Sequence, residues 1–134
     1  MENAHPLEIA MDFIKRVNSG DVQALCELMT EGHIFQDALG KRFIGRETIR
    51  QGWATYFKLV ADYQVHAEEF FQTGGRLAIF GTASGRYVGG GAAKGNFWEV
   101  PASWLAVVQD GLIAEWRVYA DNQPLRKLMG DKVP

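Results

Sequence analysis

The chain has 134 residues, 47% of them hydrophobic, and a formal net charge of −2. This length supports one domain with a substantial core, and the hydrophobic content excludes a largely disordered protein. The sequence contains no dense block of Lys and Arg, which argues against a nucleic-acid partner. No apolar run approaches the ~20 residues that a membrane span needs, so no membrane partner is expected.

Cysteine usage and the N-terminus bear on location and on metal binding. Cys26 is the only cysteine, so no intrachain disulfide can form, and a reducing cytoplasmic location fits. Residues 1–5 are polar, lack the apolar segment of a signal peptide and are expected to be a flexible extension. Cys26 and the scattered histidines show no metal-ligand spacing, so the sequence implies neither a metal nor an organic cofactor.

The N-terminal third shows helical periodicity. Pro6 suits a first helical turn, and apolar residues from Leu7 to Val17 recur at helical spacing. The sequence Asn18-Ser19-Gly20 ends this helix, and Asp21 is expected to cap a second one. A short strand over about 33–37 should follow.

The remainder predicts a turn, a third helix and then strands. Arg42-Phe43-Ile44 reads as a return strand, and Gly45 opens a helix over about 46–60. Gly81 and Gly85 are expected to mark bends or bulges, and Asp110-Gly111 is a two-residue hairpin turn. The expected long strands and short terminal helix cover residues 63–72, 76–88, 97–108, 112–120 and 123–129. Helices followed by antiparallel strands indicate an α+β fold with a pocket between its layers.

Asp37 is the leading candidate for catalysis. It lies in an apolar run, where a carboxylate is less solvated and suited to general acid–base chemistry. Asp is also a common turn residue, so a structural role before Gly40 stays open. His33 falls on the same strand face as Asp37, which leaves a His–Asp pair as a further alternative.

Four stretches, taken in order, carry a resemblance to a known superfamily: Asn18-Ser19-Gly20-Asp21, Phe35-Gln36-Asp37-Ala38-Leu39-Gly40, Gly45-Arg46-Glu47-Thr48-Ile49, and Trp98-Glu99-Val100-Pro101-Ala102-Ser103-Trp104 with the segment 110–121. In this order the chain resembles the nuclear-transport-factor-two-like superfamily, closest to its SnoaL-like and ketosteroid-isomerase-like branches. The resemblance covers nearly the whole chain, so residues 1–134 are expected to form a single SnoaL-like domain. It implies a cone-shaped fold in which a strongly bent mixed sheet and three N-terminal helices enclose a pocket.

The resemblance also implies roles for individual residues. The carboxylate at the Asp37 position is the isomerases' base. In the isomerases a Tyr and an Asp form the oxyanion hole, and their positions correspond to Phe13 and Ser103. The chain departs from this pattern at both positions, and Phe13 has no hydroxyl. SnoaL-like cyclases use an acidic residue near Asp121. Strict alternation places Asp121 off the apolar face of Trp116, so a bulge or the strand end would have to turn it inward.

The pocket lining and the partners are further expectations. The resemblance implies that Phe13, Phe35 and Ser103 line the pocket. Trp53, Phe57 and Trp116 are candidates for contacting a hydrophobic small molecule, although aromatic residues at such spacing are more often plain core. Alternate residues from Trp98 to Val108 form one apolar face, which is expected to be the outer sheet face and to pair in a homodimer.

These features favour an enzyme with isomerase-, cyclase- or lyase-like acid–base chemistry on a hydrophobic small molecule, with Asp37 as the base. The missing oxyanion donors favour the alternative, which is a non-catalytic ligand-binding or dimerisation module of the same fold.

Overall fold

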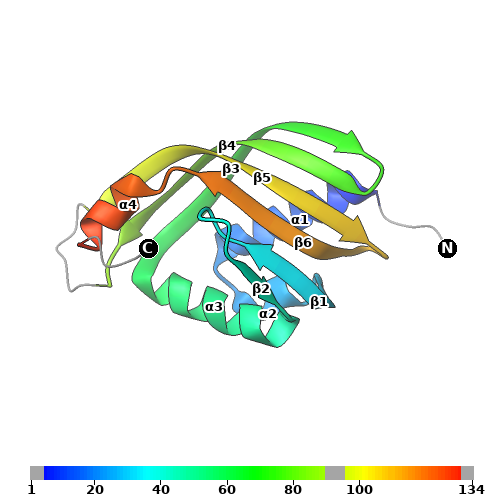
Figure 1. Cartoon of the computed structure of the whole chain (residues 1–134), viewed down its shortest axis with the longest axis horizontal. Helices are drawn as coiled ribbons and strands as arrows, with labels where there is room; N and C mark the ends of the chain where they lie inside the picture. The colour runs from blue at the N-terminus through cyan, green and yellow to red at the C-terminus, as the bar shows by residue number, and fades with distance from the viewer. Residues whose placement is uncertain (1–4, 90–95, 131–134) are drawn as a thin grey trace.

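The computed structural model describes residues 5–89 and 96–130. The expected flexible N-terminus, apart from His5, and the glycine-rich connection over 90–95 lie outside the described residues. In chain order the elements are α1 (Pro6–Ser19), α2 (Val22–Cys26), β1 (Met29–Gln36), β2 (Arg42–Ile44), α3 (Arg46–Leu59), β3 (Val60–Thr73), β4 (Arg76–Tyr87), β5 (Phe97–Gln109), β6 (Leu112–Ala120) and α4 (Gln123–Leu128), as Figure 1 shows.

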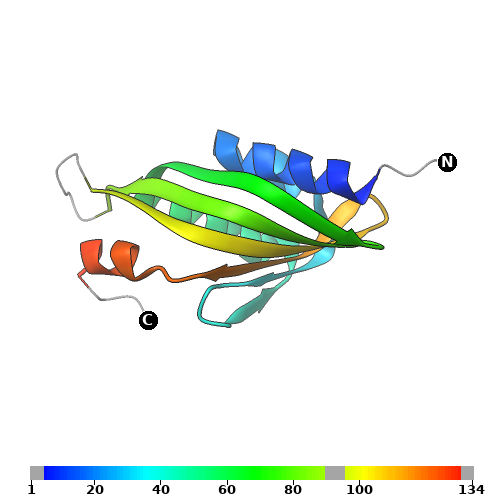
Figure 2. The same ribbon diagram turned by 90° about the horizontal axis from the view of Figure 1, so that it is seen from above.

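One mixed sheet organises the described chain, in the strand order β2-β1-β6-β5-β4-β3. All neighbours are antiparallel except β1 and β6, which run parallel. Helix α1 lies along one face of the bent sheet (Figure 2), where it contacts β3, β4, β5 and β6. The α+β fold with its mixed, bent sheet is therefore confirmed, and α4 adds a fourth helix to the three N-terminal ones.

Strand β1 begins four residues earlier than the sequence predicts. Asp21 caps α2 as expected, because its Oδ1 accepts a hydrogen bond from Ala24 N at 3.1 Å. The helix then stops at Cys26, and the carbonyl of Leu28 accepts a hydrogen bond from Ile113 N at 2.6 Å. Pairing with β6, remote in sequence, therefore converts the end of the predicted helix into strand.

The apolar alternation of β5 faces the helices rather than the outside. Trp98, Val100, Ala102, Trp104 and Ala106 are all buried in the core. The expectation that this stripe forms the outer sheet face is wrong. Alternation shows which residues share a face of a strand, but it does not show which face the helices cover.

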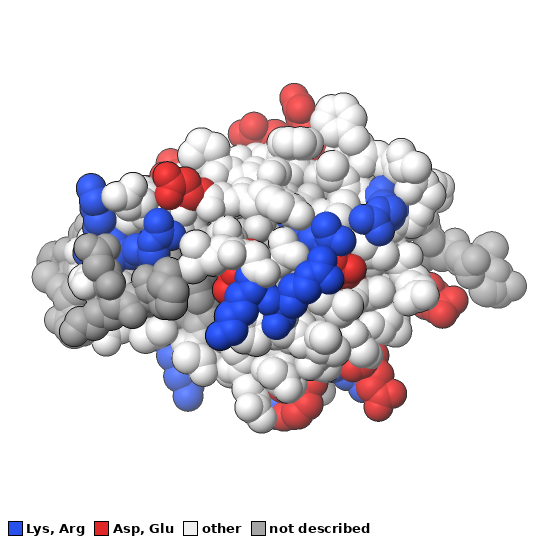
Figure 3. Space-filling view, in the orientation of Figure 1, with Lys and Arg blue, Asp and Glu red and all other residues white. Residues whose placement is uncertain are grey.

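The outer face carries different residues. Ser103 on β5 pairs with Phe80 on β4 and Tyr119 on β6, and paired residues of adjacent strands point to the same side. Phe80 and Tyr119 are each 46% exposed. Much of the face seen in Figure 3 is uncharged, and a band of Lys and Arg side chains crosses its middle.

Two hydrogen bonds from a single side chain link α1 to β3. The Asn18 side chain donates to Val65 O at 3.0 Å and accepts from Val65 N at 2.7 Å. These two bonds fix the C-terminal end of α1 against the sheet, in the Asn18-Ser19-Gly20-Asp21 segment. Among the described helices, none is long and apolar enough to cross a membrane.

Candidate functional site

Asp37 lies in the turn between β1 and β2. Its Oδ1 accepts hydrogen bonds from Leu39 N at 3.0 Å and Lys41 N at 2.9 Å. Its backbone N–H donates to Lys41 O at 2.9 Å, and its carbonyl accepts from Gly40 N at 2.9 Å. Asp37 is half-buried. Its hydrogen bonds hold the turn together, which is the structural role that the sequence left open. Within the described residues, Oδ2 of Asp37 has no hydrogen-bond partner.

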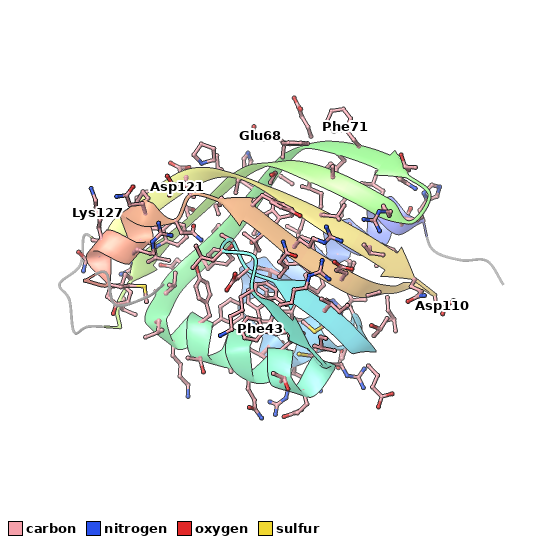
Figure 4. All side chains as sticks on the ribbon, viewed as in Figure 1. Phe43, Glu68, Phe71, Asp110, Asp121 and Lys127 are labelled. Atoms are coloured by element: carbon pink, nitrogen blue, oxygen red, sulfur yellow. The ribbon has the colours of Figure 1, made fainter. Side chains whose placement is uncertain are left out.

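Asp121 lies at the end of β6, beside α4, as Figure 4 shows. Its Oδ1 accepts from Gln123 N at 3.0 Å, and its carboxylate is 3.8 Å from the Arg126 guanidinium. The side chain is 78% exposed. The strand end therefore directs Asp121 to solvent and to the start of α4.

Phe13 and Trp116 come together in the interior. Their ring centroids are 4.7 Å apart, and Trp104 also stacks on Trp116, with centroids 6.4 Å apart. The His33 ring lies 6.2 Å from that of Phe13. We call Phe13, His33, Trp104 and Trp116 the Trp116 cluster. Ser103, by contrast, lies on the outer face, so it is not brought together with Phe13.

A second group of rings surrounds Trp53. Phe35 and Phe57 lie 5.9 and 5.4 Å from its ring, and Tyr63 lies 6.5 Å from it. Figure 4 places Phe43 beside this region, between the β1–β2 hairpin and α3. The Trp53 cluster consists of Phe35, Phe43, Trp53, Tyr56, Phe57, Tyr63 and Trp98. Phe35, Trp53 and Phe57 are thus neighbours, whereas Trp116 lies in the other cluster.

A pocket of about 240 Å³ opens between the end of α1 and the start of β3. Its lining includes Val17 and Asn18 from α1 together with Phe57, Val60 and Tyr63. Phe57 and Tyr63 belong to the Trp53 cluster, so this α1–β3 pocket reaches the aromatic interior. Neither Asp37 nor Asp121 lines it.

A larger, shallower groove of about 460 Å³ lies on the other side of the sheet. Thr30, Gly32 and Ile34 of β1 line it, and they alternate with the buried His33. Glu115, which pairs with Arg42 and Arg117, also borders it. The groove therefore belongs to the outer face and does not meet the aromatic interior.

His33 is completely buried, and its tautomer follows from its one hydrogen bond. Its Nδ1 lies 2.8 Å from the carbonyl oxygen of Ile113, which can only accept, so Nδ1 carries the proton. Burial lowers the pKa of His33, which keeps the ring neutral. Nε2 then presents a lone pair that has no partner in the described structure. A buried acceptor without a donor costs about 1–3 kcal/mol. A His33–Asp37 pair is not formed.

The indole N–H groups of Trp98 and Trp104 are also buried without a partner among the described residues. Burial raises the pKa of both Tyr63 and Tyr56, and for Tyr56 the neighbouring Tyr63 adds to the rise. Both phenols therefore stay neutral and can donate hydrogen bonds. The interior is aromatic, but it contains several polar atoms that a ligand could satisfy.

Sequence reasoning missed Tyr63, Asn18 and the free Nε2 of His33. Tyr63 lies in a strand whose alternation is interrupted by a register shift between Ala61 and Gln64, so no periodic signal assigned it to the interior. His33 shared Asp37's strand face in the prediction, but its buried carbonyl partner on β6 had no signal in the sequence. In the described ranges no group of three or more His, Cys, Asp or Glu side chains is placed to hold a metal ion.

The α+β arrangement, with an aromatic interior between α1, α3 and the sheet, is the fold of ketosteroid isomerase-like and nuclear-transport-factor-two-like proteins. The SnoaL-like domain family matches residues 10–116. The chain belongs to this family.

Solved structures confirm the fold. A protein with a ketosteroid isomerase-like fold from Catenulispora acidiphila, solved in complex with trimethylamine, superposes with a TM-score of 0.81 at 21% identity, covering 95% of this chain and 98% of its own. IdmH from Streptomyces antibioticus, which has been proposed to be a polyketide cyclase, gives 0.78 at 21% identity, over 95% and 99%. A proposed SnoaL-like polyketide cyclase from Shewanella denitrificans gives 0.79 at 18%, over 95% and 98%. A comparison with curated proteins gives no match.

Proposed function

We propose that the protein binds a small, flat, largely apolar molecule in its aromatic interior, entering through the α1–β3 pocket. The observation that carries this proposal is that Phe57 and Tyr63 line that pocket and also belong to the Trp53 cluster. The lining combines two aromatic residues with polar ones, which include Asn18, Asp62 and Gln64, and ligand sites typically join apolar walls to polar groups that orient the ligand. The pocket's volume of about 240 Å³ is large enough for a bicyclic molecule.

Acid–base chemistry is the second candidate, with Asp37 as the base. Two observations support it. Asp37 directly follows β1, in which His33 is buried and Phe35 packs against the core, and its Oδ2 is free of hydrogen bonds within the described chain. The turn bonds to Oδ1 would then fix the carboxylate in position.

A single compound tests both proposals. 2-Tetralone is a bicyclic ketone with an acidic CH₂ group beside its carbonyl. We expect it to quench tryptophan fluorescence on binding, and Phe57→Ala to weaken that binding by roughly two- to tenfold through the lost ring contact. Phe97→Ala, at an exposed outer position, is the matched control and should bind normally. Equal binding by both variants would contradict this site.

The same mixture in D₂O reports on the chemistry, because a base that removes a proton beside the carbonyl lets deuterium replace it. We expect Asp37→Asn to slow that exchange by about 10²-fold or more. The asparagine carbonyl can still accept from Leu39 and Lys41, so the turn is retained. Asp121→Asn removes the other carboxylate that the family resemblance implicates. Exchange that both variants leave unchanged would favour the non-catalytic binding module.

We also propose that the outer face pairs with a second copy of the chain. Phe71 and Phe80 meet edge to face on this side with centroids 5.9 Å apart and remain 59% and 46% exposed. Figure 4 shows Phe71 projecting away from the sheet. Adjoining exposed apolar residues on a sheet face are typical of an interface.

The oligomeric state tests this pairing. We expect the wild type to sediment as a dimer and Phe80→Glu as a monomer, since a charge would be buried opposite its symmetry mate. Met11→Glu, at an exposed apolar position on α1, should remain dimeric. A wild type that is monomeric at high micromolar concentration would exclude the proposed dimer.

A further inference from the structure

His33 Nε2 is the one buried hydrogen-bond acceptor of the Trp116 cluster that the protein leaves unused. The ring is fully buried, and its Nδ1–H is committed to Ile113 O at 2.8 Å. The remaining nitrogen therefore has a lone pair and no proton. No described side chain or backbone group supplies a donor to it.

The surroundings of this nitrogen favour a donor from outside the chain. The neighbouring ring of Phe13 has no polar atom, and it packs on Trp116. Trp104 carries an indole N–H that also lacks a partner, but the indole is stacked on Trp116. The cluster thus offers one unused acceptor and one unused donor.

A route from the α1–β3 pocket to this nitrogen follows from α1. Val17 lines the pocket, and Phe13 lies one helical turn before it on the same buried helix face. Phe13 in turn contacts the His33 side of the cluster. Displacement of the Phe13 ring would therefore open a path from the pocket towards the His33 ring.

We propose that Nε2 of His33 accepts a hydrogen bond from a hydroxyl group of the ligand, so that the interior selects hydroxylated aromatic molecules over ethers of the same shape. This inference rests on the proposed binding function and adds the chemistry of the ligand. A neutral imidazole accepts this bond without becoming charged, which suits a site where burial disfavours the imidazolium. His33 is then a specificity-determining residue, because a ligand without the hydroxyl leaves its buried acceptor unpaired.

The test compares 2-naphthol with 2-methoxynaphthalene, which differ in whether the oxygen carries a proton. We expect the wild type to bind 2-naphthol at least about tenfold more tightly, since a hydrogen bond to a buried acceptor is worth this much or more. His33→Phe should lose the preference while still binding the ether. His66→Phe, which removes a histidine whose side chain is 73% exposed, should keep it.

A second measurement needs no substitution and holds even if His33→Phe fails to fold. The ¹⁵N resonance of His33 Nε2 in the wild type should move on addition of 2-naphthol and stay in place with the ether. Equal affinities, or an unmoved resonance because a permanent internal water occupies Nε2, would overturn this inference and leave the binding function standing. Failure of both compounds to bind would overturn both.

Discussion

Replacing Phe13 with alanine is expected to destabilise the protein by about 3–5 kcal/mol. Phe13 is completely buried, and its ring packs on Trp116 at 4.7 Å. Alanine would remove the contact between α1 and the centre of the sheet and leave a cavity next to His33. Urea denaturation followed by far-UV circular dichroism measures the change in the free energy of unfolding.

Phe97→Ala is the matched control, because it removes the same atoms from a side chain that is 59% exposed. Its effect should stay within about 0.5 kcal/mol, as for most surface substitutions. A loss of less than 1 kcal/mol for Phe13→Ala would contradict the packing of α1 described above. A stable Phe13→Ala protein would also have an enlarged interior, and such apolar cavities bind small aromatic molecules.

Turn chemistry and short-range periodicity made much of the fold predictable. Arg42-Phe43-Ile44 has the predicted bounds as β2, and Asp110 and Gly111 have positive φ values of 55° and 77°, as a two-residue hairpin turn requires. Gly20 ends α1 in the left-handed conformation, with a φ of 72°. In each case the residue types alone determine the local backbone.

The features of the fold that the sequence did not predict depend on contacts between remote segments or on strand register. The start of β1 depends on pairing between Met29 and Ile113, which are far apart in the chain. The assignment of Ser103 to the pocket failed for a different reason. A shift of one residue along a strand exchanges its two faces, so aligning short motifs cannot distinguish Ser103 from its inward neighbours Ala102 and Trp104.

In the candidate site, too, the sequence predicted which residues are buried better than it predicted their individual contacts. Trp53, Phe57 and Trp116 were predicted to be buried because of their helical or strand spacing, whereas Phe13 and Phe35 were proposed for the pocket from the family resemblance. The contacts of Asp37 and His33 depend on individual hydrogen bonds. Neither the turn N–H groups that bond Oδ1 nor the Ile113 carbonyl that fixes the imidazole tautomer has a periodic signal.

Replacing Gly81 with alanine should be one of the most disruptive small changes in the sheet. A Cβ built at this position lies 1.9 Å from the carbonyl oxygen of His66 and 3.1 Å from Cα of Ala67. Both belong to the backbone of β3, next to the register shift between Ala67 and Glu69. A glycine opposite a bulge permits this close approach, as the sequence predicted for a bend or bulge at this position.

We expect Gly81→Ala to cost about 3 kcal/mol or more, because the backbone of β3 must move to make room for the methyl group. Gly52→Ala on α3 is the control, since a Cβ there meets nothing within 4 Å. Alanine in a helix interior should instead stabilise the protein by about 0.5–1 kcal/mol. Thermal unfolding of the two variants should therefore shift in opposite directions from the wild type. A Gly81→Ala protein that unfolds at the wild-type temperature would show that β3 and β4 do not approach each other as closely as the bulge requires.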